Sequence, residues 1–256
     1  MDALGAILNV PVIEQRTPAW YEKRKNRITA SEVAAILGEN PYEGADDVAA
    51  RKRGEGKPFT GNAATRYGQA HEPAAIAAYC AALGRVSFEV GLIDYEAIHG
   101  ESTDLFFLAG SPDGITVPRA ACVAATPSDR ACVRLIGPNG DEPPPGITRD
   151  ELAAFLGAEG AEGALSCARS ASSPVMLEVK CPFRRKIVHG QIPRHYYAQV
   201  QINMLICGLP FADFVEYRPP PNFELNIVRV VPDAAWLASA LPKLREFYDT
   251  TFGNAH

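Results

Sequence analysis

The amino-acid sequence predicts an α/β fold, in which a central mixed β-sheet is flanked by helices. Segments with the two-residue period of a strand alternate along the chain with segments whose apolar residues recur at helical spacing. Gly and Pro mark most of the boundaries between them. The chain has 256 residues, of which 47% are hydrophobic and 21% charged, so one domain with a single large core is expected over residues 1–256.

Three helices are predicted before residue 90. The first covers Trp20–Lys25, and the second follows Thr29-Ala-Ser-Glu32, which has the spacing of a capping box, and ends near Gly38. The third covers roughly Pro73–Leu83, because proline is tolerated in the first turn of a helix. Glu72 would head the apolar stripe of this third helix, which is an unusual place for a carboxylate.

Strands are predicted where apolar and polar residues alternate. The first spans residues 86–92, and the second spans Phe106–Val117 with an interruption at Ser111-Pro-Asp-Gly114. The third includes Glu178 and Lys180, which project from one face because successive side chains of a strand point to opposite faces.

The C-terminal part of the chain returns to alternating elements. It predicts a helix of about His195–Ile206 closed by Gly208, strands at 211–217 and 223–231, and a last helix with Asp233 as its N-cap.

Between residues 118 and 174 the composition changes to Ala, Gly, Pro and Ser, which we interpret as an insertion within the domain. A connection of this length is uncommon in a compact domain and is usually functional or disordered. Thr148–Leu156 is expected to form a short helix inside it, since Thr148 and Glu151 make another capping box.

Composition and missing motifs exclude several classes of protein. Lys and Arg number 25 against 30 Asp and Glu, and the net charge of −5 excludes a protein that coats nucleic acid by bulk charge alone. The N-terminus lacks the positive region of a signal peptide, and no run approaches the roughly 18 apolar residues of a membrane helix. We therefore expect an intracellular protein, in the cytoplasm or, for a virus, the host nucleus, that is neither secreted nor bound to a membrane. The chain has no C-x-x-C pair, phosphate loop or G-x-S-x-G motif.

One group of residues suggests hydrolytic chemistry. Asp113 follows a strand at a tight corner, and Glu178 lies on a later strand with Lys180. Two carboxylates on adjacent strands form a pocket of oxygen ligands suited to Mg²⁺. A lysine beside them can orient a water bound to the metal or help to deprotonate it, and it can offset charge on a phosphate under attack. Glu72 could add a further ligand or hold a water that binds the metal.

Each motif also has a purely structural interpretation. Ser-Pro-Asp-Gly is a common turn, in which Asp usually bonds to nearby backbone. Glu-x-Lys is a common cross-strand pair on a solvated face. The combination of the two motifs with Glu72, in that order along an α/β pattern, favours the metal site.

The sequence resembles the PD-(D/E)-x-K nucleases, and within them the lambda exonuclease and YqaJ-type viral recombinase group related to herpesvirus alkaline nucleases. The resemblance runs from about Glu14 to Pro219, interrupted by the insertion. Five blocks carry it in order: Ala19-Trp20 with Arg24 and Ile28-Thr-Ala-Ser-Glu-Val33, Tyr67-Gly68 with Glu72, Ser111-Pro-Asp-Gly114, Leu177-Glu-Val-Lys-Cys-Pro-Phe183, and Ala198-Gln-Val-Gln201. It implies a restriction-endonuclease-like core.

By position, the resemblance implies that Asp113, Glu178 and the Val179 carbonyl bind one or two Mg²⁺ ions, or Mn²⁺ in their place. It also implies that Lys180 serves the attacking water and that Glu72 supports the site. A glutamine of the following helix completes the family's site. Gln199 and Gln201 are about 200° apart on a helix, so only one can face the metal, and we expect Gln199, with Gln201 exposed or in a packing bond.

Arg24 and Ser31 resemble the positions that hold a terminal 5′-phosphate in exonucleases of this group. A helix N-terminus favours an anion, and an arginine adds a forked donor. The alternative is a simple capping box with Arg24 on a solvated face. Trp20 is expected in the core, rather than as a wedge between bases.

Two basic clusters could contact the DNA backbone, although a run of charges is usually a solvated face. They are Arg51-Lys-Arg53 and Arg184-Arg185-Lys186, and the second is preferred because it follows the active-site strand. In one respect the chain departs from the family pattern: the insertion separates Asp113 from Glu178 by 65 positions, where the family has a short hairpin. Pairing of the two strands can survive, since the cost of loop closure grows slowly with length.

The expected function is Mg²⁺-dependent hydrolysis of DNA, as an exonuclease that degrades one strand of a linear duplex from a 5′-phosphorylated end and leaves 3′ overhangs for recombination. The family implies a single-strand annealing protein as partner and a homo-oligomer, a ring-shaped trimer. Two alternatives stay open: an endonuclease of the same fold that cleaves DNA or RNA, and a catalytically idle DNA-binding module.

Overall fold

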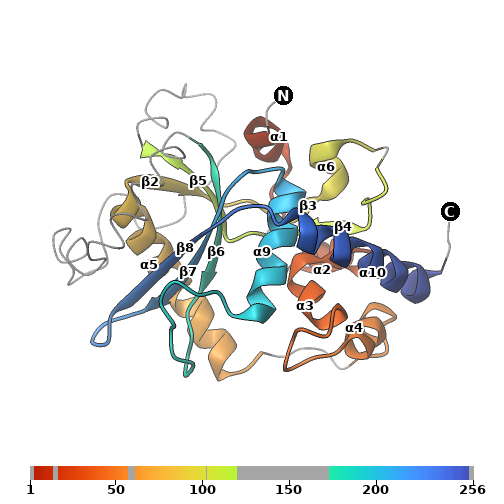
Figure 1. Cartoon of the computed structure of the whole chain (residues 1–256), viewed down its shortest axis with the longest axis horizontal. Helices are drawn as coiled ribbons and strands as arrows, with labels where there is room; N and C mark the ends of the chain where they lie inside the picture. The colour runs from red at the N-terminus through yellow and green to blue at the C-terminus, as the bar shows by residue number, and fades with distance from the viewer. Residues whose placement is uncertain (1–2, 14–16, 57–60, 102, 120–172, 254–256) are drawn as a thin grey trace.

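Two β-sheets and the helices around them make up the fold of the chain (Figure 1). The computed structural model describes residues 3–13, 17–56, 61–101, 103–119 and 173–253. The strands are β1 (Ile28–Thr29), β2 (Arg85–Phe88), β3 (Ile93–Asp94), β4 (Leu108–Gly110), β5 (Gly114–Pro118), β6 (Val175–Lys180), β7 (Ala212–Arg218) and β8 (Glu224–Val230). The predicted α/β fold with a mixed sheet is therefore confirmed.

The larger sheet has the order β2-β5-β6-β7-β8, and the smaller has the order β1-β4-β3. Within the larger sheet β6 and β7 run parallel, and the other neighbouring strands are antiparallel. Gly114 lies opposite Leu177 in the pair of β5 and β6. The two strands that carry the predicted site therefore pair directly, although the insertion separates them in sequence.

The helices cover both faces of the larger sheet. They are α1 (Ala3–Asn9), α2 (Pro18–Lys25), the 3₁₀ helix η1 (Ala30–Glu32), α3 (Val33–Ile36), α4 (Ala45–Lys52), α5 (Ala63–Leu83), α6 (Tyr95–His99), α9 (Arg194–Cys207) and α10 (Ala234–Phe252). One hydrophobic cluster joins α5 to Leu177 and Val179 of β6, and a second joins α9 to Met176. Glu178 and Lys180 share the face of Met176, because residues of a strand alternate between faces, and so they face α9.

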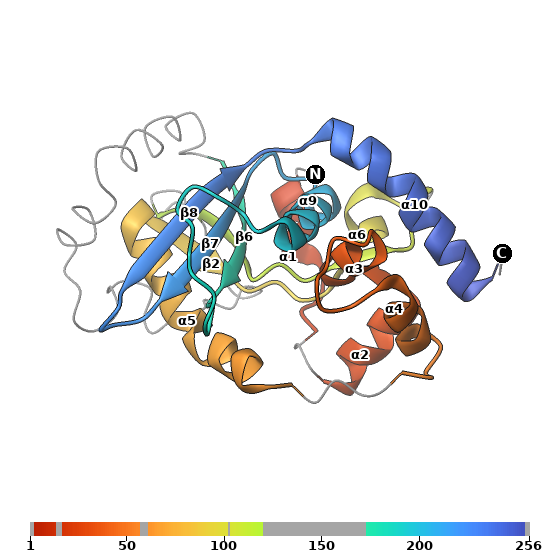
Figure 2. The ribbon, with the colours of Figure 1, turned by 60° about the horizontal axis from the view of Figure 1, so that its bottom comes forward.

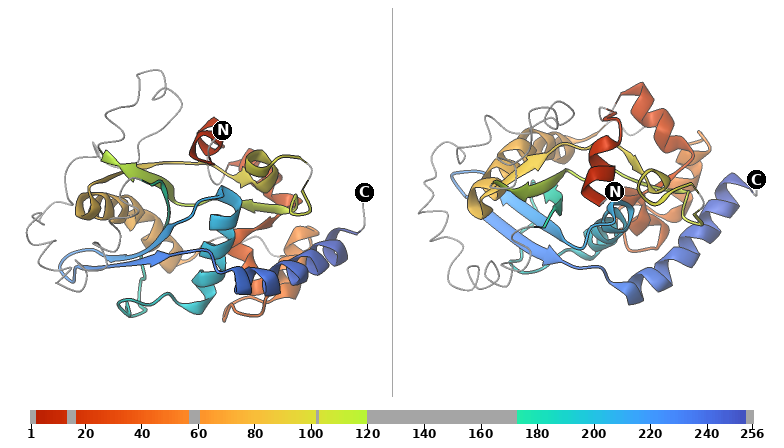
Figure 3. Two further views of the ribbon diagram at one scale, coloured as in Figure 1. Left: turned by 45° about the horizontal axis from the view of Figure 1, so that its top comes forward. Right: turned by 90° about the horizontal axis from the view of Figure 1, so that it is seen from above.

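Helix α9 lies between two groups of elements in Figures 2 and 3. On one side are the larger sheet, α5 and the connection 181–193, and on the other are α2, α3 and α4. Helix α10 follows β8, packs against α3 and extends toward the C-terminus away from the sheet. Its N-cap is Asp233, as predicted, whose carboxylate accepts the backbone N–H of Trp236 at 2.9 Å.

Several predicted local signals are confirmed. The backbone N–H of Thr29 donates to the Glu32 carboxylate at 2.9 Å, which completes the predicted capping box. Helix α9 ends at Gly208, whose positive φ of 62° suits glycine. The expected helix at Thr148–Leu156 lies outside the described residues.

The predicted helix of Pro73–Leu83 begins too late. Helix α5 starts ten residues earlier, at Ala63, where Asn62 caps it by accepting the backbone N–H of Thr65 at 2.9 Å. Pro73 lies inside the helix on its exposed side. A proline there removes one helical hydrogen bond, and the exposed Gln69 carbonyl that loses its donor can bind water instead.

The predicted strand of residues 86–92 is wrong in its extent and its buried face. Strand β2 ends at Phe88, and it buries Arg85 and Ser87 rather than the apolar Val86 and Phe88. Arg85 can be buried because its guanidinium donates to the hydroxyl and the carbonyl of Thr116 at 2.9 Å and to the carbonyl of Ser173 at 2.6 Å.

Candidate active site

The centre of the site is the carboxylate of Glu178, on the face of β6 that is covered by α9. Glu178 is fully buried and accepts hydrogen bonds from two α9 side chains, at 2.6 Å from Gln199 Nε2 and at 3.0 Å from Asn203 Nδ2. The ammonium of Lys180 contacts the same carboxylate oxygen as Gln199. The structure thus places Glu178, Lys180 and Gln199 together, as the sequence led us to expect. Gln201 instead makes packing bonds to the backbone of Val231 and Asp233.

Asp113 reaches this group from the corner before β5. Its backbone N–H donates to the carbonyl of Leu177 at 3.0 Å, which fixes the corner against β6. Its carboxylate accepts the backbone N–H of Val179 at 2.7 Å. Two carboxylates, from Asp113 and Glu178, therefore border the backbone of Val179.

The charges of this group are strongly coupled. Burial raises the pKa of Glu178 to about 7, against the opposing effect of Lys180 and with further repulsion from Asp113. Burial disfavours the charge of Lys180, yet attraction to Glu178 and Asp113 raises its pKa above the ordinary value. Lys180 is therefore an ammonium that can orient water or a phosphate oxygen, rather than a ready proton acceptor.

Asn203 belongs to the site, although the sequence analysis did not select it. It is fully buried, and its Oδ1 has no hydrogen-bond partner within the described part of the chain. A Cβ on Gly110 would lie 2.2 Å from that oxygen, so any other residue there would force the Asn203 side chain to move. The sequence feature that could have identified Asn203 is its spacing of four residues from Gln199, which puts both side chains on one face of a helix.

Glu72 lies on α5, close to the residues that follow β6. Its charge acts on Cys181, whose pKa is raised to about 12 mainly by burial and then by Glu72. Cys181 belongs to the apolar cluster on the α5 face of the sheet, opposite to Glu178. Among the described residues, no group of three or more His, Cys, Asp and Glu could hold a metal ion. The role of Glu72, as a further ligand or as a support of the site, stays a prediction.

Arg24 and Ser31 meet in a second polar cluster. The Arg24 guanidinium donates to the hydroxyls of Thr29 at 2.8 Å and Ser31 at 3.3 Å, and it stacks 4.1 Å from the centre of the Trp20 ring. Trp20 is only partly buried, contrary to the expected place in the core. Its indole N–H donates to the hydroxyl of Ser111 at 3.4 Å, two residues before Asp113. This bond joins the second cluster to the carboxylate site.

The basic run Arg51-Lys-Arg53 is only partly solvated, because Arg53 is exposed whereas Lys52 is buried. Lys52 is buried, and its ammonium lies 2.8 Å from the Glu32 carboxylate and donates to the carbonyl of Arg24 at 2.9 Å. Arg51 and Arg53 also pair with carboxylates. Burial disfavours the charge of Glu32, but Lys52 and Arg24 hold the pKa of this carboxyl below its ordinary value. One member of this basic run, Lys52, thus forms a buried ion pair with Glu32 next to Arg24, which the run of charges in the sequence did not indicate.

The three residues of the second basic run, Arg184-Arg185-Lys186, differ in their exposure and in their partners. Arg185 pairs with the fully buried Glu216 and lies 5.7 Å from the ring of Tyr196, which also lies 5.2 Å from the ammonium of Lys180. Arg184 and Lys186 are exposed. Arg185 therefore anchors the connection after β6, and the two flanking residues are the ones that stay accessible to a ligand.

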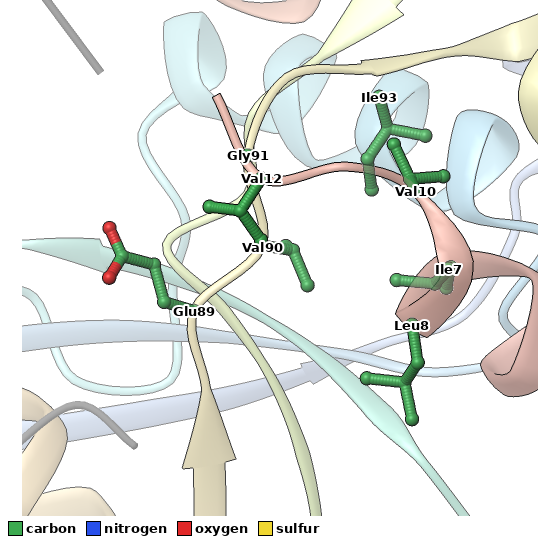
Figure 4. Close-up of a pocket in the computed structure, with 8 residues that line it drawn as sticks. All are labelled: Ile7, Leu8, Val10, Val12, Glu89, Val90, Gly91 and Ile93. Carbon is green, nitrogen blue, oxygen red and sulfur yellow. The ribbon is translucent and has the colours of Figure 1, made fainter. Parts of the chain in front are cut away.

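A small recess elsewhere contains none of the predicted site residues. It lies between α1 and residues 89–93 (Figure 4) and is lined by Ile7, Leu8, Val10, Val12, Glu89, Val90, Gly91 and Ile93. Its lining is apolar except for Glu89, whose carboxylate points away from Ile7 and Leu8 (Figure 4). The recess offers no set of polar groups for catalysis.

Comparison with known proteins defines the class of this protein. The mixed α/β fold brings Asp113, Glu178 and Lys180 to one corner of its larger sheet. Residues 19–210 match the model of the YqaJ-like viral recombinase domain, and the chain belongs to that family. In the structure described here, no helix is both long and apolar enough to cross a membrane.

The chain is also similar to individual proteins. The chain is 23% identical over 221 residues to the uncharacterized protein R354 of Acanthamoeba polyphaga mimivirus, and the match covers 84% of this chain but 31% of the relative. The fold is similar to that of the alkaline exonuclease LHK-Exo from Laribacter hongkongensis, solved alone and in complex with dAMP. Both structures give a TM-score of 0.56 with 22% identity, over 92% of each chain.

Proposed function

We propose that the domain is a divalent-metal-dependent exonuclease that hydrolyses linear double-stranded DNA from a 5′-phosphorylated end. The observation that carries the proposal is the convergence of Asp113, Glu178 and Lys180 at one corner of the sheet, with the Arg24 and Ser31 cluster joined to that corner through Trp20. The dAMP bound to the structural neighbour LHK-Exo supports a mononucleotide product.

The residues present suit Mg²⁺ or Mn²⁺. Asp113 and Glu178 offer carboxylate oxygens on either side of Val179, and oxygen is the ligand atom that these ions prefer. The N–H and C=O of one strand residue point toward the same edge, so the Val179 carbonyl is directed to the edge where Asp113 binds its N–H. One or two ions bound here would lower the pKa of a water and offset charge on the phosphate.

The chain's own residues then position the reactants. Lys180, held as an ammonium by Glu178 and Asp113, can orient the attacking water and stabilise negative charge that develops on the phosphate. Gln199 and Asn203 fix the carboxylate of Glu178 through its two oxygens. Glu72 supports the site from its edge.

The second cluster can recognise the chain end. Arg24 donates hydrogen bonds to the hydroxyls of Thr29 and Ser31, which a phosphate oxygen can replace or join, although its charge is also attracted to the buried Glu32 carboxylate. Arg184 and Lys186 are proposed to contact the DNA backbone, and Arg185 to hold them in place through Glu216. The 3′ overhang that results would suit a single-strand annealing protein, and the assembly is proposed to be a ring-shaped trimer, both by analogy with the family.

The test uses linear duplexes with a 5′-phosphate or a 5′-hydroxyl and a covalently closed circle, each incubated with Mg²⁺. We expect mononucleotide release from the phosphorylated end only, and none from the Lys180→Ala variant. Nicking of the circle would favour the alternative endonuclease. Metal-independent binding without turnover of any substrate would overturn the enzymatic proposal in favour of an idle binding module.

A further inference from the structure

Three aromatic rings form a surface beside the carboxylate site that the proposed chemistry does not use. Tyr67 and His71 lie one turn apart on α5, with ring centres 4.3 Å apart, and Phe183 follows β6 with its centre 5.3 Å from that of Tyr67. Phe183 is 43% exposed, and the other two are half-buried. The guanidinium of Arg184 lies 5.3 Å from the Phe183 ring centre. We call Tyr67, His71 and Phe183 the aromatic surface.

The aromatic surface lies near the end of β6, on the side of α5, because Tyr67 packs against the cluster that contains Cys181 and Val179. His71 precedes Glu72, and Phe183 follows Lys180 by three residues. Cys181, which lies between Lys180 and Phe183 in the chain, is close enough to both Glu72 and Tyr67 for their charges to interact. The surface therefore lies at the end of β6 where Lys180 emerges.

The cluster of Arg24 and Trp20 approaches the site from the other side. It is joined to the carboxylates through Ser111, before Asp113, whereas the aromatic surface comes after Lys180. Figures 1 and 2 agree on this arrangement: α2 and α3 lie on one side of α9, and α5 and the connection 181–193 lie on the other. The Arg24 cluster and the aromatic surface therefore lie on opposite sides of α9.

The chemistry of the surface fits nucleobases. Exposed rings beside arginines are typical of sites for single-stranded nucleic acid, because every base has a face that can stack and every phosphate carries a charge. Arg66 and Arg184 are exposed, and each is the neighbour in sequence of one of the rings, Tyr67 and Phe183. A third arginine, Arg218, is close enough to Tyr67 for its charge to lower the pKa of the tyrosine, although burial raises that pKa by more. A paired base inside a duplex has no free face, so the surface can stack only on an unpaired base.

We propose that the aromatic surface stacks on unpaired nucleobases at the opened end of the DNA substrate. The inference rests on the proposed function, because that function brings a DNA end to Asp113 and Glu178. Phe183 is the exposed member of the surface and therefore the residue whose ring is available to a base.

The test measures binding in a Lys180→Ala background, which is designed to prevent hydrolysis. Fluorescence anisotropy compares three probes: a short single strand, a duplex with three unpaired nucleotides at its end, and a paired duplex closed by hairpins at both ends. We expect Phe183→Leu to weaken binding of the first two probes by about tenfold, which corresponds to the loss of one base stack. Binding of the closed duplex should change less than twofold.

Matched variants separate stacking from other effects. Phe183→Trp should restore binding, and Tyr42→Leu should have no effect, since Tyr42 is an aromatic residue 83% exposed on the other side of α9, beside His195. An abasic version of the single strand should bind the parent and Phe183→Leu proteins alike. An equal loss with all three probes, or no loss with any, would overturn the proposal.

Failure of the two proposals can be told apart. Hydrolysis of linear duplex by the protein with Lys180 intact tests the nuclease function separately. Turnover without a base-dependent loss in Phe183→Leu would overturn only the aromatic surface. A base-dependent loss in a protein without turnover would support the surface and overturn the nuclease.

Discussion

The carboxylate of Glu178 shows at the scale of a single residue how the fold prepares a charge for a ligand. It is removed from water and is surrounded by Lys180, Gln199 and Asn203, which satisfy its oxygens. Its pKa is nevertheless raised to about 7, because burial and Asp113 outweigh the lysine. A divalent cation would offset this cost, which makes stability, pH and metal binding interdependent.

We predict that the protein without metal becomes less stable as the pH rises from about 4.5 to about 7. The pKa of Glu178 is higher in the folded protein than its ordinary value of 4.5, so the unfolded chain ionises first and gains stability relative to the folded state. The full contribution is about 3 kcal/mol, of which about 2 kcal/mol falls between pH 5.5 and pH 8. Urea denaturation in EDTA at pH 5.5 and pH 8 measures it, and Glu178→Gln should flatten the dependence.

Metal should reverse this trend. Mg²⁺ must compete with a proton for Glu178 at pH 6 but not at pH 8, so the shift of Tm by millimolar Mg²⁺ should be larger at pH 8. Glu178→Gln should remove most of the shift. An equal shift at both values of pH in the parent protein would contradict the assignment of Glu178 as a ligand.

A second prediction at this scale concerns the buried pair of Lys52 and Glu32. Lys52→Met leaves the Glu32 carboxylate buried without its closest cation, so we expect a loss of about 3–5 kcal/mol in the free energy of unfolding. Adding Glu32→Gln should restore part of it. Arg53→Gln, which removes an exposed pair with Glu55, serves as control and should cost less than about 1 kcal/mol. Equal urea midpoints for Lys52→Met and Arg53→Gln would refute this account.

At the scale of elements, α5 shows why the sequence misplaced a helix boundary. Proline is favoured at the first position of a helix, so the sequence predicts that the helix begins at Pro73, but the ten residues before it are also helical. The helix continues through the proline because Ile76 and Tyr79 are fully buried against the sheet and because Asn62 caps an earlier start. Tertiary packing thus outweighs one missing hydrogen bond on the exposed side.

The cap of α5 can be tested directly. Asn62→Ala removes the acceptor for the backbone N–H of Thr65 and should lower the free energy of unfolding by about 1 kcal/mol, whereas Asn62→Asp should retain it. Thermal or urea denaturation measures the difference. If the helix instead began at Pro73, both substitutions would be neutral.

At the scale of the whole molecule, β5 and β6 hold the two halves of the site together. Thr116 lies opposite Val175, and continuing this register would put Pro118 opposite Ser173. Arg85 binds the backbone of both Thr116 and Ser173, which fixes the strand ends from β2. The pairing that forms the site therefore depends on described residues on either side of the insertion.

We predict that a chain in which residues 120–172 are replaced by a short Gly-Ser linker still folds and keeps its carboxylate site. A shorter loop has a smaller entropy of closure, and the pairs of β5 and β6 are unchanged. Circular dichroism would measure whether the shortened chain folds, and the Mg²⁺-dependent shift of Tm at pH 8 would measure whether it keeps the carboxylate site. Arg85→Met in the shortened chain serves as a destabilised comparison. Loss of cooperative unfolding would show that the insertion is part of the core.

The sequence by itself determined the order of most elements and three of the residues that meet around Glu178, namely Asp113, Lys180 and Gln199. Alternation predicted β6, and capping residues predicted the helices that follow Thr29 and Asp233. The helical angle indicated that only one of Gln199 and Gln201 could face Glu178, and Gln199 is the one that does. These features depend on local periodicity and hydrogen bonding, which short segments carry in full.

Only the tertiary structure decided which charges are buried and which apolar residues are left half exposed. Lys52 and Arg85 are buried because partners distant in sequence satisfy them, Glu32 in one case and Thr116 in the other. Asn203 entered the site because α9 packs across β6. Burial of a polar group depends on donors and acceptors from other elements, so no pattern along one segment can reveal it.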